Sequence, residues 1–114
     1  MDDDGLYYKP GRFTASVWYD NDQSQTKNNT EQPVPNASVQ VYDSANRLVG
    51  TYPTNAQGMI SGSLIPGTYT FKLVEISNYV ITTLKTTSFT IMSEIDQHVY
   101  DFGIVPMLPN SPAA

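Results

Sequence analysis

Short segments of alternating polar and apolar residues, separated by turn residues, run through most of this 114-residue chain. The clearest segment carries large apolar side chains at every second position, as Tyr69, Phe71 and Leu73. A period of two is typical of a β-strand with one buried face. Pro66 and Gly67 precede this segment and form a tight-turn signal. The chain is therefore expected to fold from short strands.

The same reading applied along the chain predicts eight strands. They are residues 12–19, 37–42, 47–52, 59–64, 68–75, 79–84, 87–91 and 99–105. Gly58 ends one of the intervening turns and is suited to a positive φ, while Asp96–His98 are expected to lie in a single turn. About seven or eight short strands at this spacing, without a sustained helical period, predict an all-β antiparallel β-sandwich.

The length suits one domain with a single core. We expect the β-sandwich to span residues 12–105, between an extended acidic N-terminal arm at 1–11 and a proline-rich C-terminal tail at 106–114. No apolar stretch approaches the roughly 20 residues that cross a bilayer. The acidic start Met1–Asp4 does not resemble a signal peptide.

Charge and composition exclude several functions. The formal net charge is −5, with 6 basic against 11 acidic residues, so no basic face is expected to bind nucleic acid. The chain has no cysteine, which excludes disulfides and cysteine-based zinc sites. Proteins, including further copies of this chain, are the expected partners.

Catalytic signals are weak. The single histidine, His98, has Asp96 and Asp101 near it in sequence, and a His–Asp pair can orient a general base. However, no serine lies in a G-x-S-x-G motif, and one histidine cannot anchor a zinc site. We expect His98 to be a solvated loop residue and the protein not to be an enzyme.

Five phrases occur in an order that resembles a known family. They are VWYDND at 17–22, PVPNASVQVYD at 33–43, TNAQG at 54–58, LIPGTYTF at 64–71 and DFG at 101–103. This order is similar to the B-type repeat modules of serine-aspartate-repeat surface adhesins, and more broadly to collagen-adhesin B-type and carboxypeptidase-regulatory-like modules. The resemblance covers about Phe13–Val105 and implies an Ig-like or prealbumin-like sandwich. Within it, fold roles are expected for Gly58, Pro66, Gly67, Tyr69 and Phe71.

The resemblance also implies a calcium loop directly after the first strand. Positions one, three, five, seven, nine and twelve of an EF-hand-like loop are Asp20, Asp22, Ser24, Thr26, Asn28 and Glu31. A hard cation needs six or more oxygen ligands, with a final carboxylate closing the loop. Three residues depart from the pattern, because Gln25 replaces the usual glycine, Ser24 replaces the usual aspartate and Lys27 lies within the loop. A polar surface loop with chance spacing is the alternative interpretation.

A second family feature is the isopeptide bond, in which a first-strand lysine joins a last-strand asparagine beside a central acid. Glu75 resembles that acid. The predicted first strand has no lysine and the predicted last strand has no asparagine. We therefore expect no such bond, and a place for Glu75 on a sheet face or edge.

Three functional hypotheses remain open. The first is a non-enzymatic structural or adhesive module of an extracellular or cell-surface assembly, such as a spacer, an adhesin repeat or an assembly subunit. The second is a virion component, and the third is a carbohydrate-binding accessory module. The third requires an exposed aromatic row that could contact a glycan; the candidates are Trp18, Tyr19, Tyr42, Tyr52, Tyr79 and Tyr100. Cross-strand packing is the other interpretation of these residues.

Overall fold

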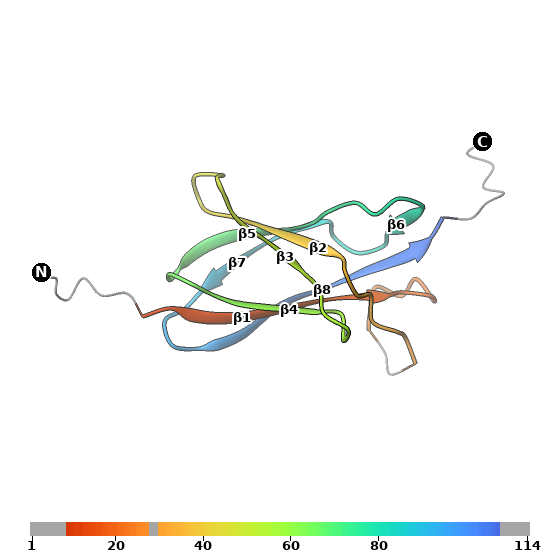
Figure 1. Ribbon diagram of the computed structural model, residues 1–114, viewed down its shortest axis with the longest axis horizontal. Helices are drawn as coiled ribbons and strands as arrows, with labels where there is room; N and C mark the ends of the chain where they lie inside the picture. Colours follow the sequence, from red (N-terminus) through yellow and green to blue (C-terminus); the bar gives the residue numbers. More distant parts are fainter. Residues whose placement is uncertain (1–8, 28–29, 108–114) are drawn as a thin grey trace, which may run out of the picture.

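The computed structural model describes residues 9–27 and 30–107, and these fold into a two-layer β-sandwich (Figure 1). The strands are β1 (Gly11–Tyr19), β2 (Ser38–Tyr42), β3 (Leu48–Pro53), β4 (Met59–Leu64), β5 (Gly67–Leu73), β6 (Tyr79–Ile81), β7 (Thr86–Ile91) and β8 (Asp96–Pro106). The expected all-β sandwich is confirmed. The predicted arm and tail lie mostly outside the described residues.

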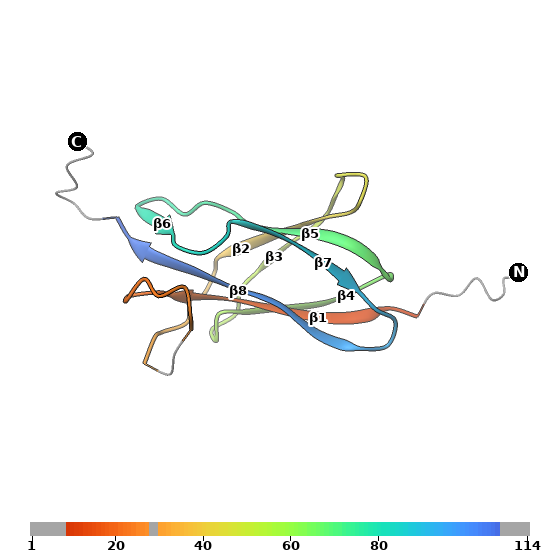
Figure 2. The ribbon, with the colours of Figure 1, turned by 180° about the vertical axis from the view of Figure 1, so that it is seen from behind.

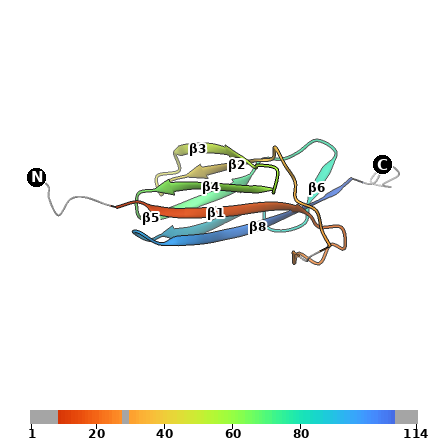
Figure 3. The same ribbon diagram turned by 60° about the horizontal axis from the view of Figure 1, so that its bottom comes forward.

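Each layer is a four-stranded sheet. One has the order β4-β1-β8-β6 and the other β3-β2-β5-β7, and the two layers face each other in the view from behind (Figure 2). All paired neighbours are antiparallel except β1 and β8, which run parallel from Arg12↔Asp96 to Tyr19↔Ile104. Figure 3 shows β1 between β4 and β8. The first and last strands are therefore direct neighbours.

The core lies between the inward faces of the two sheets. Its members that are at most 1% exposed include Phe13, Phe71, Phe102, Leu73, Ile91 and Ile104. Full burial of such a side chain contributes roughly 1.5–3 kcal/mol. The period-two pattern of β5 predicts its inward face correctly, because alternate side chains of a strand point to opposite faces.

Strand β8 departs from the sequence prediction. Asp96–His98 were expected in a turn, but they begin the strand and pair with β1. The register between β1 and β8 shifts after Thr14↔His98, and pairing resumes at Ser16↔Asp101. This β-bulge adds a residue on β8 and interrupts the alternation on which the prediction depended.

The outer face of β1 is covered at one end. Trp18 is fully buried, although it alternates away from the core residues Phe13 and Val17. Pro33 forms a bridge with Trp18, so the segment after the polar loop runs alongside the end of β1. Gly103 pairs with Trp18 on the neighbouring strand, and a Cβ atom there would lie 3.0 Å from the Asp20 Cβ and 3.1 Å from the indole. A glycine permits this close approach.

The start of β1 and the end of β8 lie at opposite ends of the sandwich (Figure 1). At the β1 end, the Pro10 carbonyl accepts a hydrogen bond from the Glu94 amide, and the Arg12 amide donates to the Ile95 carbonyl. Residues 10–12 are thereby fixed against the β7–β8 turn. No helix within 9–27 and 30–107 is long and apolar enough to cross a membrane.

Candidate functional site

The polar loop that follows β1 brings three carboxylates together. Oxygen atoms of Asp20, Asp22 and Glu31 all lie within 4.8 Å of one another. Asp20 is fully buried, Glu31 is 9% exposed, and Asp22 is exposed. Two buried carboxylates side by side repel each other, so a cation between them would be stabilising. These three residues are defined here as the acidic loop site.

Asp20 organises the loop through its side chain. Its Oδ1 accepts a hydrogen bond from the Ser24 amide at 3.2 Å, and its Oδ2 accepts one from the Gln25 amide at 3.0 Å. The Thr82 hydroxyl, from the segment after β6, also donates to Oδ2 at 2.6 Å. One buried carboxylate therefore fixes the loop and joins it to the β6 end of the sheet.

Glu31 closes the loop onto the covered end of β1. The Trp18 indole Nε1 donates a buried hydrogen bond to Glu31 Oε1 at 2.6 Å. The Asp22 amide lies 3.5 Å from Oε2 of the same carboxylate. Glu31 thus joins the strand to the loop, and its orientation is set by a rigid aromatic partner.

The backbone turns where an EF-hand-like loop requires it. Gln25 occupies the sixth position, where glycine is usual, and has a φ of +64°. The side chain does not prevent the left-handed conformation, although it makes this conformation more costly. The departure noted in the sequence therefore leaves the turn of the loop in place.

Two of the other predicted ligands, Ser24 and Thr26, make hydrogen bonds within the loop. The Ser24 hydroxyl donates to the Thr26 carbonyl at 3.0 Å, and its amide also donates to the Asp22 carboxylate. Hydrogen bonds from Ser24 are the main reason that the Asp22 pKa is lowered. Thr26 is exposed, and Asn28 lies outside the described residues. The structure thus brings together the carboxylates of Asp20, Asp22 and Glu31.

Glu75 follows the end of β5 and is exposed. Its Oε2 lies 2.6 Å from the Lys85 ammonium, and the hydrogen bond to Lys85 is the main cause of its lowered pKa. Strand β1 has no lysine and strand β8 no asparagine. The first and last described strands therefore lack the lysine and the asparagine that such an isopeptide bond would join.

The tyrosines that the structure describes form no exposed aromatic row. Tyr19 and Tyr79 have ring centroids 5.9 Å apart, and the Tyr52 ring contacts Phe13 edge-on at 5.3 Å. Tyr100 contacts Phe102 in the same way at 4.9 Å. The Tyr69 hydroxyl donates to the Ile65 carbonyl at 2.6 Å, across the turn before β5. These contacts lie within one strand or one sheet, between the two sheets or across a turn, so packing within the sandwich accounts for these tyrosines.

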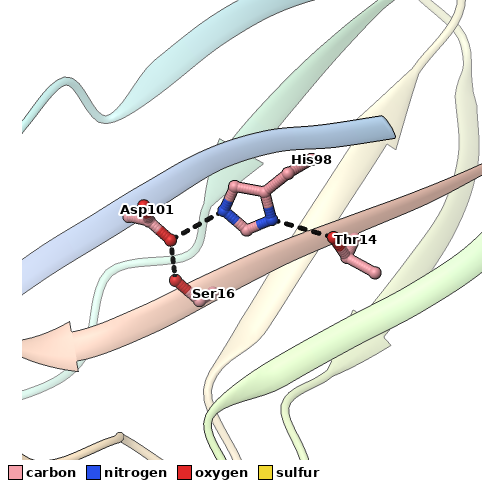
Figure 4. Close-up of polar contacts among 4 residues, drawn as sticks. All are labelled: Thr14, Ser16, His98 and Asp101. Carbon is pink, nitrogen blue, oxygen red and sulfur yellow. Dashed lines mark hydrogen bonds and ion pairs between the residues drawn. The ribbon is translucent and has the colours of Figure 1, made fainter. Parts of the chain in front are cut away.

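His98 occupies a position that the sequence did not reveal. It lies on β8 and not in a loop, and it is 43% exposed. Its Nδ1 is 2.8 Å from the Thr14 hydroxyl, and its Nε2 is 2.7 Å from Asp101 Oδ1 (Figure 4). Ser16 also donates to this carboxylate. Thr14 is 84 residues from His98 in sequence, so only the strand register could have predicted the contact.

The profile of the SdrD B-like domain family matches residues 12–104. The chain belongs to this family. The match covers every strand apart from the first residue of β1 and the last two of β8. The resemblance that the sequence phrases indicated is therefore confirmed. No curated protein matches this sequence.

Several solved structures share the fold. The minor pilin GBS52 of Streptococcus agalactiae has a TM-score of 0.67 at 21% identity, over 94% of this chain and 49% of that one. The shaft pilin SpaA of Lactobacillus rhamnosus GG has a TM-score of 0.65 at 13% identity, over 88% and 51%. The major pilin BcpA of Bacillus cereus has a TM-score of 0.60 at 17% identity, over 81% and 28%.

This chain spans about half or less of the length of those pilins. At these identities, the likeness concerns the fold alone. Together, the family and the fold support the expectation of a non-enzymatic structural module. They lend no support to the virion or carbohydrate-binding alternatives.

Proposed function

We propose that this chain is an in-line spacer module of a cell-surface adhesin or pilus-like protein. The observation that carries this proposal is the parallel pairing of the two terminal strands, β1 and β8. The chain enters at the start of β1 and leaves at the end of β8, at opposite ends of the sandwich (Figure 1). A module connected in this way adds its length to a stalk.

The same pairing suits a module that bears load. A force applied between the two ends pulls β1 and β8 in opposite directions along their shared axis. The hydrogen bonds between them would then be strained together, in shear, and not broken one after another. Side chains reinforce the pair, since Ser16 and Thr14 on β1 contact Asp101 and His98 on β8.

The solution mass tests the spacer role against that of an autonomous assembly subunit. A spacer connected through its ends should be a monomer of 12.6 kDa across a concentration series, measured by light scattering after gel filtration. A closed oligomer or a polymer at micromolar concentration would contradict the spacer role and favour a subunit that assembles through its own surfaces.

We propose further that the acidic loop site binds calcium. The convergence of Asp20, Asp22 and Glu31 supports this, since carboxylate oxygens are the ligands that calcium prefers. A bound cation would offset the repulsion among the carboxylates and hold the loop against Trp18 and Thr82. The site would thereby stiffen the end of the module from which β8 leaves.

A calcium titration followed by thermal unfolding tests this second role. A ligand that binds only the folded state at 100 times its Kd raises the stability by about 2.7 kcal/mol. We therefore expect the melting temperature to rise with calcium and to fall again with a chelator. An Asp22→Asn variant should lose much of this response. Unchanged melting at millimolar calcium would contradict the proposal.

A further inference from the structure

A hydrogen-bonded chain of three side chains crosses the outer face of the β1–β8 pair. Thr14 contacts His98 Nδ1, and His98 Nε2 contacts Asp101 (Figure 4). Thr14 is half-buried, while His98 and Asp101 are 43% and 38% exposed. This Thr14–His98–Asp101 chain shares no residue with the acidic loop site, although the loop residues Gln25–Lys27 line a hollow together with His98 and Asp101.

The directions of these hydrogen bonds follow from the chemistry of the groups. An ionised carboxylate only accepts hydrogen bonds, so His98 Nε2 carries the proton that Asp101 accepts. In a neutral imidazole the other nitrogen, Nδ1, is then an acceptor. The Thr14 hydroxyl therefore donates to Nδ1. Hydrogen bonds from His98 and Ser16 lower the pKa of Asp101 despite its partial burial, which keeps the carboxylate ionised at neutral pH.

The β-bulge in β8 creates this arrangement. Residues three apart on a regular strand point to opposite faces, yet His98 and Asp101 both point outward. The extra residue on β8 between Thr14↔His98 and Ser16↔Asp101 restores both side chains to the same face. The parallel register then sets one hydroxyl of β1 opposite each of them.

An open hollow of about 340 Å³ lies beside the threonine. Its lining residues are Arg12, Phe13, Thr14, Asp96, Gln97 and His98. A small acyl group can enter this space and reach the Thr14 hydroxyl. The exposed Arg12 guanidinium also lines this hollow, where it is paired with Asp96 at 3.6 Å.

We infer that Thr14 is a nucleophilic acyl acceptor, modified by small activated esters or thioesters. The Thr14 Oγ1 attacks the acyl carbonyl while His98 Nδ1 takes the hydroxyl proton. The tetrahedral intermediate then expels the alcohol or thiol, which receives that proton from His98. A Thr14–O–acyl ester and the free leaving group remain, so atoms and electrons balance. The step is one modification of a surface side chain and does not require turnover.

The chain offers an internal comparison for this reactivity. Thr68 and Thr90 are exposed, and their hydroxyls contact each other at 3.1 Å. They lie on β5 and β7, in the other sheet. Both are therefore accessible hydroxyls that contact another hydroxyl and not an imidazole. A probe that reacts merely with exposed threonines would modify all three positions alike.

The test uses 4-nitrophenyl acetate at neutral pH, followed by peptide mass spectrometry. The expected product is an acetyl ester on Thr14 that hydroxylamine removes, whereas acetyl amides on lysines resist it. General-base activation typically contributes 10²–10⁴-fold, so acetylation of Thr14 should exceed that of Thr68 and Thr90 by roughly 10²-fold or more. Equal acetylation at the three positions would overturn the inference.

Variants separate the nucleophile from the base. Thr14→Val should abolish the hydroxylamine-sensitive ester, and Thr14→Ser should retain it. His98→Gln, checked for an unchanged far-ultraviolet circular dichroism spectrum, should lower Thr14 acetylation to the level of Thr68. Undiminished Thr14 acetylation in folded His98→Gln would overturn the inference. The inference would also be overturned if only His98 carried an acetyl group and Thr14→Val released nitrophenolate as fast as the unsubstituted protein.

Discussion

The outer face of the β1–β8 pair has two halves that are covered differently. At the end of β1, Trp18 is fully buried beneath the loop and bonded to Glu31. Toward the start of β1, Thr14 is half-buried beside the exposed His98. The first half is an aromatic side chain sealed by a polar loop, and the second is a polar network open to solvent.

The difference shows how one strand pair supports two kinds of chemistry. Burial makes the Trp18 half important for stability, because an indole in a closed site contributes both apolar area and a hydrogen bond. The open half contributes less to stability, since water replaces much of what its exposed polar groups gain from one another. Its side chains are instead accessible to reagents.

The largest effect is expected from Trp18→Ala. Truncation of a buried tryptophan or phenylalanine typically costs about 3–5 kcal/mol, and here it also leaves Glu31 without its indole donor. The free energy of unfolding, measured by urea titration, should fall by that amount. Thr14→Val, on the open half, is the matched control and should cost much less. Similar losses for the two variants would remove the distinction between the halves.

A smaller effect is expected from Asp20→Asn. The substitution preserves the volume of the buried side chain but replaces one acceptor oxygen, so donors among Ser24, Gln25 and Thr82 lose a partner. An unsatisfied buried donor costs about 1–3 kcal/mol. The loop should also become more susceptible to proteolysis.

Asp22→Asn is the control for that variant, because Asp22 is exposed. It should leave the calcium-free stability nearly unchanged and reduce the response to calcium. If Asp22→Asn destabilised the calcium-free protein as much as Asp20→Asn, the loop would depend on its exposed carboxylate, and the buried one would not be its anchor.

The smallest effect on stability is expected from lowering the pH, which acts on Asp101 in the open half of the face. Hydrogen bonding to His98 is the main cause of the lowered Asp101 pKa, with Ser16 and the charge of Lys27 adding to it. The pKa of Asp101 is thus lower in the folded state than in the unfolded state, where an aspartate has a pKa of about 3.9. The ionised carboxylate therefore adds stability at pH values above that unfolded-state pKa. This stability is lost as the pH falls through the folded-state pKa.

The melting temperature of Asp101→Asn should therefore lie below that of the unsubstituted protein at pH 6. The gap between the two should narrow progressively below about pH 4. Thermal melts at matched ionic strength measure this directly. A gap of constant size from pH 6 to pH 2 would show that the Asp101 charge makes no contribution.

Much of the fold follows from the sequence, because alternation and turn residues are local signals. The inward face of β5 and the turn at Gly58, whose φ is +70°, both depend on residues within a few positions of each other. The bulge in β8 was missed because its extra residue breaks the period of two. The adjacent pair Val17–Trp18, two large apolar residues on opposite faces, was the one local sign that the outer face of β1 is covered.

The sites were less predictable than the strands. Asp20, Asp22 and Glu31 lie in one loop, so their spacing could suggest convergence. The contact of Thr82 with Asp20 spans 62 residues and that of Thr14 with His98 spans 84. Such contacts depend on which strands are neighbours and in what register, and neither is encoded in a local pattern.

The most direct test of the mechanical role proposed for the β1–β8 pair compares two pulling directions in single-molecule force spectroscopy. Force through the chain ends shears β1 against β8. Force between the N-terminal end and a cysteine introduced at Glu94, in a chain without other cysteines, peels the two strands apart from their common end. If the β1–β8 pair resists force in shear, the unfolding force through the chain ends should be several-fold higher. Equal forces in the two directions would contradict this mechanical role.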